Sequence, residues 1–292
     1  MISLFKKRRK RIGLALGGGA ARGGAHIGVI NALKAANIPI DYVAGTSIGA
    51  LVGGFLAIDK MDALEQLVLG LDWKTIIKFF DVVFPKVGLV EGKKVEEILR
   101  RSLGEVDIKE LPIPFAAVAT DIVSGEEVIL NAGDIVEAIR ASIAIPGIFT
   151  PIKWQDRILV DGGLVNPVPV NVVKKMGAEI VIGVDVNAKV VIPTMQKMKK
   201  LTSKDKETKE AFPNIIEIIM SAIYIMEQQI TKYKLASDKA DILIEPEVGH
   251  IGFLEFHRTP ETIAEGYKTA TEKMKEIKAL ANVWILFYAQ KQ

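Results

Sequence analysis

The chain has 292 residues, 49% of them hydrophobic, which is enough to bury the core of one large α/β domain or two small ones. It contains no cysteine, which excludes disulfides, thiolate metal sites and a thiol nucleophile. The formal charge of +3 comes from one run of six cations, without which the chain would carry −3. The run consists of Lys6, Lys7, Arg8, Arg9, Lys10 and Arg11.

This basic run predicts a short tail, residues 1–11, in front of a domain that starts at residue 12. With the apolar residues 1, 2, 4 and 5, it is typical of a segment that contacts anionic lipid head groups. A solubilising leader and a nucleic-acid-binding tail have the same composition. Because no alternation of aromatic and basic residues continues into the domain, we expect no nucleic-acid partner.

The apolar run at residues 12–16 is too short for a signal peptide and ends in three glycines. No run reaches the ~18 apolar residues of a membrane-spanning helix. We therefore expect a cytoplasmic protein that is soluble or attached peripherally to a membrane.

The first expected strand, residues 12–16, leads through the glycine-rich residues 17–24 into an expected helix over 25–36. Such a turn occurs in dinucleotide-binding loops, which also need an acidic residue at the end of the second strand. Here Asp41 stands at the start of that strand. The alternative is an oxyanion hole made of bare backbone N–H groups, and we favour it.

The second expected strand covers residues 42–44, and a helix starts at Ile48. Between them, Gly45 and Gly49 flank Ser47 in a G-x-S-x-G pattern. This pattern predicts a sharp turn that lifts the serine hydroxyl to a helix N-terminus, where negative charge is stabilised. An ordinary glycine-rich turn has the same residues, so the rest of the chain has to decide.

A short expected strand over residues 157–160 ends at Asp161, which Gly162 and Gly163 follow. We expect the Asp161 carboxylate to be exposed on a tight turn, at the same edge of the sheet as Ser47. Alone, this sequence is typical of a plain turn.

Three apolar segments remain open to two interpretations each. Residues 59–92, expected to be helical, fit a lid or acyl-chain pocket over the site, or the core of a cap segment. Residues 142–149 fit a pocket lining or an interior loop. Residues 283–288 fit docking on the domain or contact with a membrane.

The remaining segments alternate between the two kinds of element. Expected strands cover residues 115–121, 127–130, 179–186 and 241–246, and expected helices cover 135–145, 214–236 and 262–281. The alternation predicts an α/β fold with a mostly parallel central sheet and helices on both faces. We expect a single domain over residues 12–292 with a helical extension from about residue 198, in which 198–212 form a linker and 214–236 pack on the sheet.

Four of these segments, in this order, resemble the patatin-like phospholipase family. They are residues 17–23, 45–49, 142–147 and 161–163. The resemblance covers roughly residues 12–170 and is strongest to small bacterial and archaeal members. It implies a three-layer sandwich that hydrolyses fatty-acyl ester bonds of lipids, without a metal or an organic cofactor.

The resemblance also implies roles for single residues. Ser47 corresponds to the nucleophile and Asp161 to its base. The oxyanion segment corresponds to Gly17, Gly18, Gly19 and Arg22, with the amide of Ile48 as a further donor, and the motifs are supported by Gly45, Gly49, Gly162 and Gly163. Ala20 stands where the family usually has a glycine. Its methyl group narrows the loop, but the backbone N–H donor of this position is kept.

The residues themselves leave a histidine base open, because a serine hydroxyl needs a positioned base. His26 follows the glycine-rich turn, and His250 and His257 follow Asp161 in the order of α/β-hydrolases. The family resemblance favours a Ser–Asp dyad.

Two further hypotheses use the same fold. In the first, the site serves an acyltransferase, a thioesterase or a peptidase. In the second, the protein is a non-catalytic regulator that binds membranes or a partner.

Overall fold

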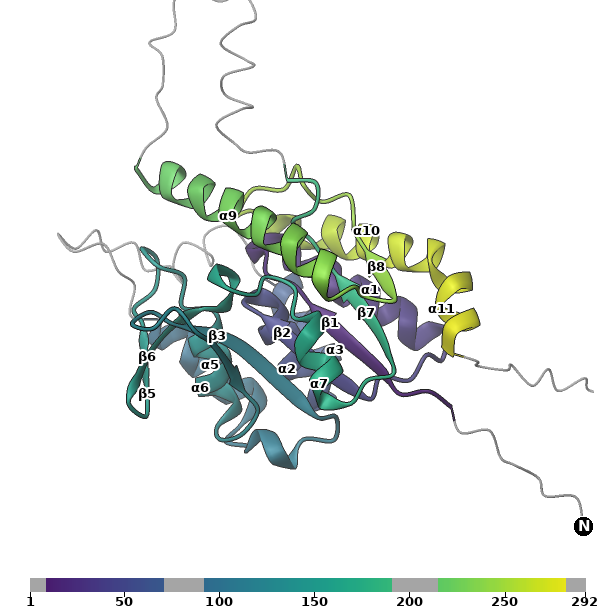
Figure 1. The fold of residues 1–292 in the computed structure, drawn as a ribbon, viewed down its shortest axis with the longest axis horizontal. Helices are drawn as coiled ribbons and strands as arrows, with labels where there is room; N and C mark the ends of the chain where they lie inside the picture. The colour runs from purple at the N-terminus through teal and green to yellow at the C-terminus, as the bar shows by residue number, and fades with distance from the viewer. Residues whose placement is uncertain (1–8, 71–91, 191–214, 282–292) are drawn as a thin grey trace, which may run out of the picture.

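The computed structural model describes residues 9–70, 92–190 and 215–281 (Figure 1). The expectations for residues 1–8, 71–91, 198–212 and 283–288 lie outside the described residues. Within the described residues, the end of the basic tail is attached to the domain by two ion pairs. Arg9 pairs with Asp41 at 2.6 Å, and Arg11 pairs with Glu179 at 3.2 Å.

A central sheet carries the fold, and five of its strands are parallel. In spatial order these are β3 (Phe115–Asp121), β2 (Tyr42–Thr46), β1 (Ile12–Leu16), β7 (Ile180–Val184) and β8 (Ile242–Ile244). The antiparallel part lies beyond β3 and consists of β4 (Glu127–Leu130), β6 (Arg157–Asp161) and β5 (Ile152–Trp154).

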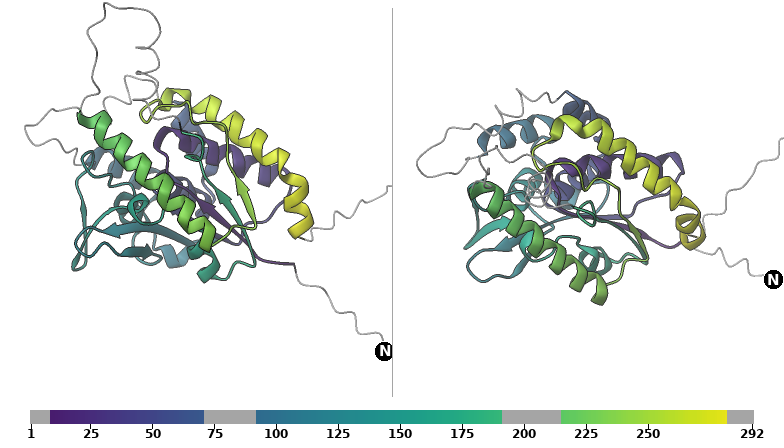
Figure 2. Two further views of the ribbon diagram at one scale, coloured as in Figure 1. Left: turned by 45° about the horizontal axis from the view of Figure 1, so that its top comes forward. Right: turned by 90° about the horizontal axis from the view of Figure 1, so that it is seen from above.

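Helices cover both faces of this sheet, which gives three layers (Figures 1 and 2). The larger layer contains α1 (Gly24–Ala35), α2 (Ile48–Ala57), α3 (Met61–Leu69), α5 (Lys93–Leu103), α6 (Ile135–Ser142), α10 (Thr259–Glu272) and α11 (Met274–Ala281). The smaller layer contains α7 (Val170–Met176) and α9 (Ile215–Ser237).

The alternation of side chains along β1 explains the two layers. Leu14 and Leu16 point into the core under the larger layer, whereas Ala15 points into the smaller core beside α7. Gly13 lets α7 approach, because a β-carbon there would stand 3.0 Å from Val173 Cβ. Each fully buried leucine contributes about 2 kcal/mol to folding, so these strands need apolar residues on both faces.

The expected fold class is confirmed, and most strands lie where the sequence predicts them. Three elements were not expected: β5, α5 and α7. The proline-rich stretch before α7 resembles an extended segment, but Pro169 is its N-cap and leaves the helix free to start at Val170. Among the described residues, no helix combines the length and apolar character that crossing a bilayer requires.

The register of the strands brings Ser47 and Asp161 to the same level of the sheet. Thr46 pairs with Val118, so the next residue, Ser47, comes level with Ala119. On the other side of β3, Ala119 pairs with Asp161. The strand β6 runs antiparallel, so Asp161 reaches this level from the opposite direction, and the two residues face each other across β3.

Candidate active site

Ser47 occupies a strained turn between β2 and α2. Its backbone has φ 56° and ψ −125°, a conformation that costs a non-glycine residue about 1–3 kcal/mol. A β-carbon on Gly45 would collide with the carbonyl oxygen of Gly49, and one on Gly49 would collide with that of Leu16. Both glycines are therefore required by the close backbone packing of the turn.

The side chains of Ser47 and Asp161 meet in a buried hydrogen bond. Ser47 Oγ donates to Asp161 Oδ2 at 2.5 Å, and the two residues are only 6% and 4% exposed. Asp161 Oδ1 accepts from the amide of Gly163 at 2.8 Å, and the Asp161 carbonyl accepts from Thr120 Oγ1 at 2.9 Å. Residues 114 positions apart in the chain thus form one fixed pair.

Burial changes the acidity of this carboxyl. It raises the pKa of Asp161 to about 6, and the hydrogen bonds from Ser47 and Gly163 counteract part of that rise. A carboxylate with such a pKa is a stronger base than an ordinary aspartate and is still ionised at neutral pH. The expectation that Asp161 is exposed is wrong, because α9 covers the turn that follows it.

A second serine anchors the nucleophile's backbone. Ser142 Oγ accepts from the amide of Ser47 at 2.9 Å and donates to the carbonyl of Val118 at 2.6 Å. The sequence indicated only that residues 142–149 fit a pocket lining, and Ile143, Ile145 and Phe149 do line the cavity described below. Nothing in the pattern distinguished Ser142 from a small filler residue.

The glycine-rich segment lies beside Ser47, since a β-carbon on Gly18 would stand 3.5 Å from Ser47 Cβ. Two of its amides are already used: Gly17 donates to Val184 and Gly18 to Pro167, each at 3.0 Å. Among the described residues, the amide of Gly19 has no acceptor.

The amide of Ile48, the first residue of α2, likewise has no acceptor within the described part of the chain. It shares the positive end of the helix dipole, which favours an anion.

Arg22 supports the loop from behind. Its guanidinium is buried, donates to Asn187 Oδ1 and to the Ile251 carbonyl at 3.0 Å each, and stacks 4.6 Å from the centre of the Tyr224 ring. It therefore ties the loop to the segment after β7 and to α9. The structure gives it no direct contact with Ser47.

An apolar cavity of about 180 Å³ opens next to Ser47. Its walls come from the glycine-rich turn, α2, α3, α5 and the segment around Phe253. In the expected lid or acyl-chain segment, residues 61–69 form α3, whose Leu64, Leu67 and Val68 line this cavity. The part of that segment in α3 is therefore both core and cavity wall.

Helix α9 closes the site on the other side of the dyad. Its Met220, Ile223 and Tyr224 form a small apolar cluster with Ile145, Ile148 and Phe253 beside the site. Only its C-terminal part, through Leu235, packs against the core beside the sheet. The expectation that this helix packs on the sheet therefore holds for its end and not for its N-terminal half.

Glu227 on the same face of α9 was not predicted as a site residue. Its carboxyl is buried, accepts from Asn187 Nδ2 at 3.2 Å and lines a small cavity together with Ser47 and Asp161. Burial, together with the nearby Asp161, raises its pKa to about 8. A glutamate on the inward face of an apolar helix is the sequence signal that could have identified it.

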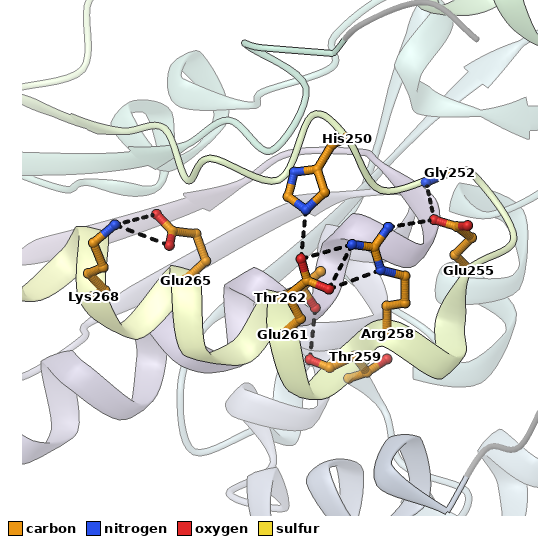
Figure 3. Close-up of polar contacts among 9 residues, drawn as sticks. All are labelled: His250, Gly252, Glu255, Arg258, Thr259, Glu261, Thr262, Glu265 and Lys268. Carbon is orange, nitrogen blue, oxygen red and sulfur yellow. Dashed lines mark hydrogen bonds and ion pairs between the residues drawn. The ribbon is translucent and has the colours of Figure 1, made fainter. Parts of the chain in front are cut away.

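None of the three histidines takes part in the pair. His26 is fully buried and hydrogen-bonds to the Gly17 carbonyl at 2.8 Å, and burial lowers its pKa to about 4. His250 pairs with Glu261 at 2.6 Å, which Arg258 also contacts (Figure 3). His257 lies in a short 3₁₀ turn, Phe256–Arg258. Among the described residues, Ser47 Oγ has Asp161 as its one hydrogen-bond partner.

Comparisons with known proteins identify the family of this chain. A sequence model described as patatin-like phospholipase matches residues 14–174, more than half of the chain. An uncharacterized NTE family protein of Mycobacterium tuberculosis is 30% identical over 91% of both chains. The neuropathy target esterase sws of Drosophila melanogaster is 33% identical over 61% of this chain and 13% of that protein.

A lysophospholipase of Scheffersomyces stipitis is 34% identical over 61% of this chain and 12% of that protein. Among solved structures, VipD from Legionella pneumophila matches with a TM-score of 0.51 and 13% identity. The match covers 94% of this chain and 67% of VipD, and it supports the fold alone.

Proposed function

Because this chain belongs to the patatin-like phospholipase family and is a lipid ester hydrolase, we propose that it cleaves fatty-acyl esters with Ser47 as nucleophile and Asp161 as base. The observation that carries the proposal is the buried 2.5 Å hydrogen bond between Ser47 Oγ and Asp161 Oδ2. The strained backbone of Ser47 supports it, because such strain concentrates at functional residues.

In the first half of the reaction, Ser47 Oγ attacks the ester carbonyl carbon and its proton passes to Asp161 Oδ2. The carbonyl oxygen becomes an oxyanion. When the tetrahedral intermediate collapses, the bond to the alcohol breaks, and the alcohol leaves with the proton from Asp161. The acyl group stays on Ser47 as an ester.

In the second half, Asp161 takes a proton from water, and the hydroxide attacks the acyl-enzyme. The ester bond to Ser47 breaks, Ser47 Oγ recovers the proton from Asp161, and the fatty acid is released. Water is the one co-reactant, and Asp161 is ionised again at the end of the cycle.

We assign the oxyanion donors to the amides of Gly19 and Ile48. Within the described residues both lack an acceptor, whereas the amides of Gly17 and Gly18 already donate to carbonyl groups. Gly17, Gly18 and Arg22 then shape and anchor the loop. Gly45, Gly49 and Gly162 let backbones approach closely, whereas Gly163 leaves room for the carboxyl of Glu227.

The acyl chain fits the apolar cavity beside Ser47. Its lining is almost entirely apolar and adjoins the hydroxyl, so a hydrocarbon chain gains from leaving water there. A lipid ester is therefore the substrate class that the cavity favours over a peptide or a small polar ester.

A hydrolysis assay on a panel of phospholipids, lysophospholipids, thioesters and peptides tests the proposal. Wild type should release fatty acid from lipid esters, and Ser47→Ala and Asp161→Asn should each lower kcat by at least about 10³-fold while unfolding like wild type. Full activity in Ser47→Ala, or hydrolysis of peptides alone, would refute it.

A further inference from the structure

Helix α9 has two apolar sides. The inward side, with Met220, Ile223 and Tyr224, closes over the site. The opposite side, which we call the outer face, is defined by Ile218, Ile219, Ile225 and Met226, each between 40% and 49% exposed. Both views in Figure 2 show α9 (green) on the outside of the molecule.

The outer face is a coherent surface because its members recur at two-turn spacing. Ile225 lies seven residues after Ile218, and Met226 lies seven after Ile219, so both pairs share one side of the helix. No charged residue occurs from 218 to 226. Among the described residues, no apolar cluster includes any of the four side chains.

An interfacial rim continues the same stripe. Lys232 follows Ile225 by seven residues, and Tyr233 follows Met226 by seven; both are exposed. A lysine beside a tyrosine suits the head-group region of a membrane, where the ammonium meets phosphates and the ring sits between water and hydrocarbon. The stripe thus passes from purely apolar to basic and aromatic along the helix.

We propose that the outer face of α9 docks on the surface of a phospholipid bilayer and holds the site against the layer that contains its substrate. The inference rests on the proposed function for its biological meaning, since a lipid ester hydrolase has to reach lipid. The position of the helix supports this proposal. The inward side of α9 covers Ser47 and Asp161, and its outer face is exposed at the surface of the protein.

The outer face belongs to the helix that covers the dyad. The inward side of α9 covers Asp161 and one side of Ser47, and the apolar cavity opens on the other side of Ser47. A bilayer that accepts the outer face acts on the same rigid element that covers the dyad. The membrane surface is therefore the partner whose chemistry matches both the stripe and the site.

The test compares two variants of the full chain. Ile218→Gln combined with Ile225→Gln removes half of the outer face while keeping good helix formers. Tyr267→Gln is the matched control, because Tyr267 is 44% exposed on α10 and belongs to no site. Binding is measured by co-sedimentation with vesicles of phosphatidylcholine and phosphatidylglycerol, at low and high salt.

We expect wild type and Tyr267→Gln to bind alike, and the double variant to bind at least about tenfold more weakly. The difference should persist in high salt, which screens contacts of the basic tail. Hydrolysis of vesicle lipid should fall in parallel, whereas hydrolysis of a soluble short-chain ester should stay unchanged.

Equal vesicle binding by all three proteins, or no binding by wild type, would overturn docking. So would a dimer of wild type that the double variant converts to a monomer in sedimentation velocity, because a second copy would then cover the face. If wild type hydrolyses no ester at all, the proposed function is refuted. The vesicle-binding measurement then still tests whether the outer face docks on a bilayer.

Discussion

At the residue scale, burial sets the behaviour of the two acids near Ser47. Asp161 loses water on every side yet keeps two hydrogen bonds, so its pKa rises to about 6. Glu227 has one hydrogen bond from Asn187 and lies near another carboxyl, so its pKa rises further, to about 8. The negative charge of Asp161 therefore favours the protonated form of Glu227.

The pKa of Asp161 predicts the pH dependence of hydrolysis. A base has to be ionised, so kcat/KM on a soluble ester should rise about tenfold per pH unit below pH 6 and level off above it. A pH series with the wild-type enzyme measures this. A rate that rises only near pH 8 would instead point to Glu227 as the group that limits the reaction.

The free energy of unfolding should fall as the pH rises and Glu227 ionises. Its folded pKa, about 8, lies above the ordinary value of 4.5, so the folded state binds this proton more tightly than the unfolded state. The stability it contributes is complete below pH 4.5 and is lost progressively up to pH 8.

Glu227→Gln keeps an acceptor for Asn187 without the ionisation. Urea unfolding should therefore show the variant more stable than wild type by a few kcal/mol at pH 8.5 and similar to it at pH 5. A stability difference that does not change with pH would contradict the assignment.

Ser142 should matter for the position of the nucleophile. Ser142→Ala leaves the amide of Ser47 and the carbonyl of Val118 without their partner, which costs about 1–3 kcal/mol of unfolding free energy. We expect kcat to fall about tenfold or more, because the turn that holds Ser47 loosens. Ser124→Ala is the control: this serine lies on an exposed turn, where its Oγ accepts from the amide of Glu126 at 3.3 Å, and the change should leave kcat unaltered and stability within about 0.5 kcal/mol.

At the element scale, the β2–α2 turn shows how sequence and structure correspond. The G-x-S-x-G pattern predicts a sharp turn, and the backbone contacts of Gly45 and Gly49 show why this turn requires glycine at both positions. The pattern could be recognised because its residues are adjacent in the chain, although Gly49 also meets the backbone of Leu16. Ser142 and Glu227 were missed because their roles depend on elements distant in the chain.

Gly45→Ala should destabilise the fold by about 3 kcal/mol or more, because its β-carbon would overlap the backbone of Gly49. Gly70→Ala is the matched control: its β-carbon meets only carbonyl oxygens at 3.4 and 3.5 Å, and stability should stay within about 0.5 kcal/mol. Chemical denaturation of both variants provides the comparison. Equal stability of the two would contradict the steric account of the turn.

At the scale of the whole molecule, strand register brings the site together. The sequence predicts the strands of Ser47 and Asp161 but contains no local signal for the order β6-β3-β2 or for the reversed direction of β6. It likewise predicts α9 as an amphipathic helix without showing that its N-terminal half leaves the sheet and covers the dyad. Long-range packing decides both features.

The central claim is that Ser47 is a nucleophile activated by Asp161, and covalent labelling tests it most directly. Wild type is treated with a fluorophosphonate probe, and the modified peptide is identified by mass spectrometry. The account predicts labelling at Ser47 and at no other serine, with the rate reduced at least about 10²-fold in Asp161→Asn. Labelling at another serine, or equal rates in the folded variant and wild type, would contradict it.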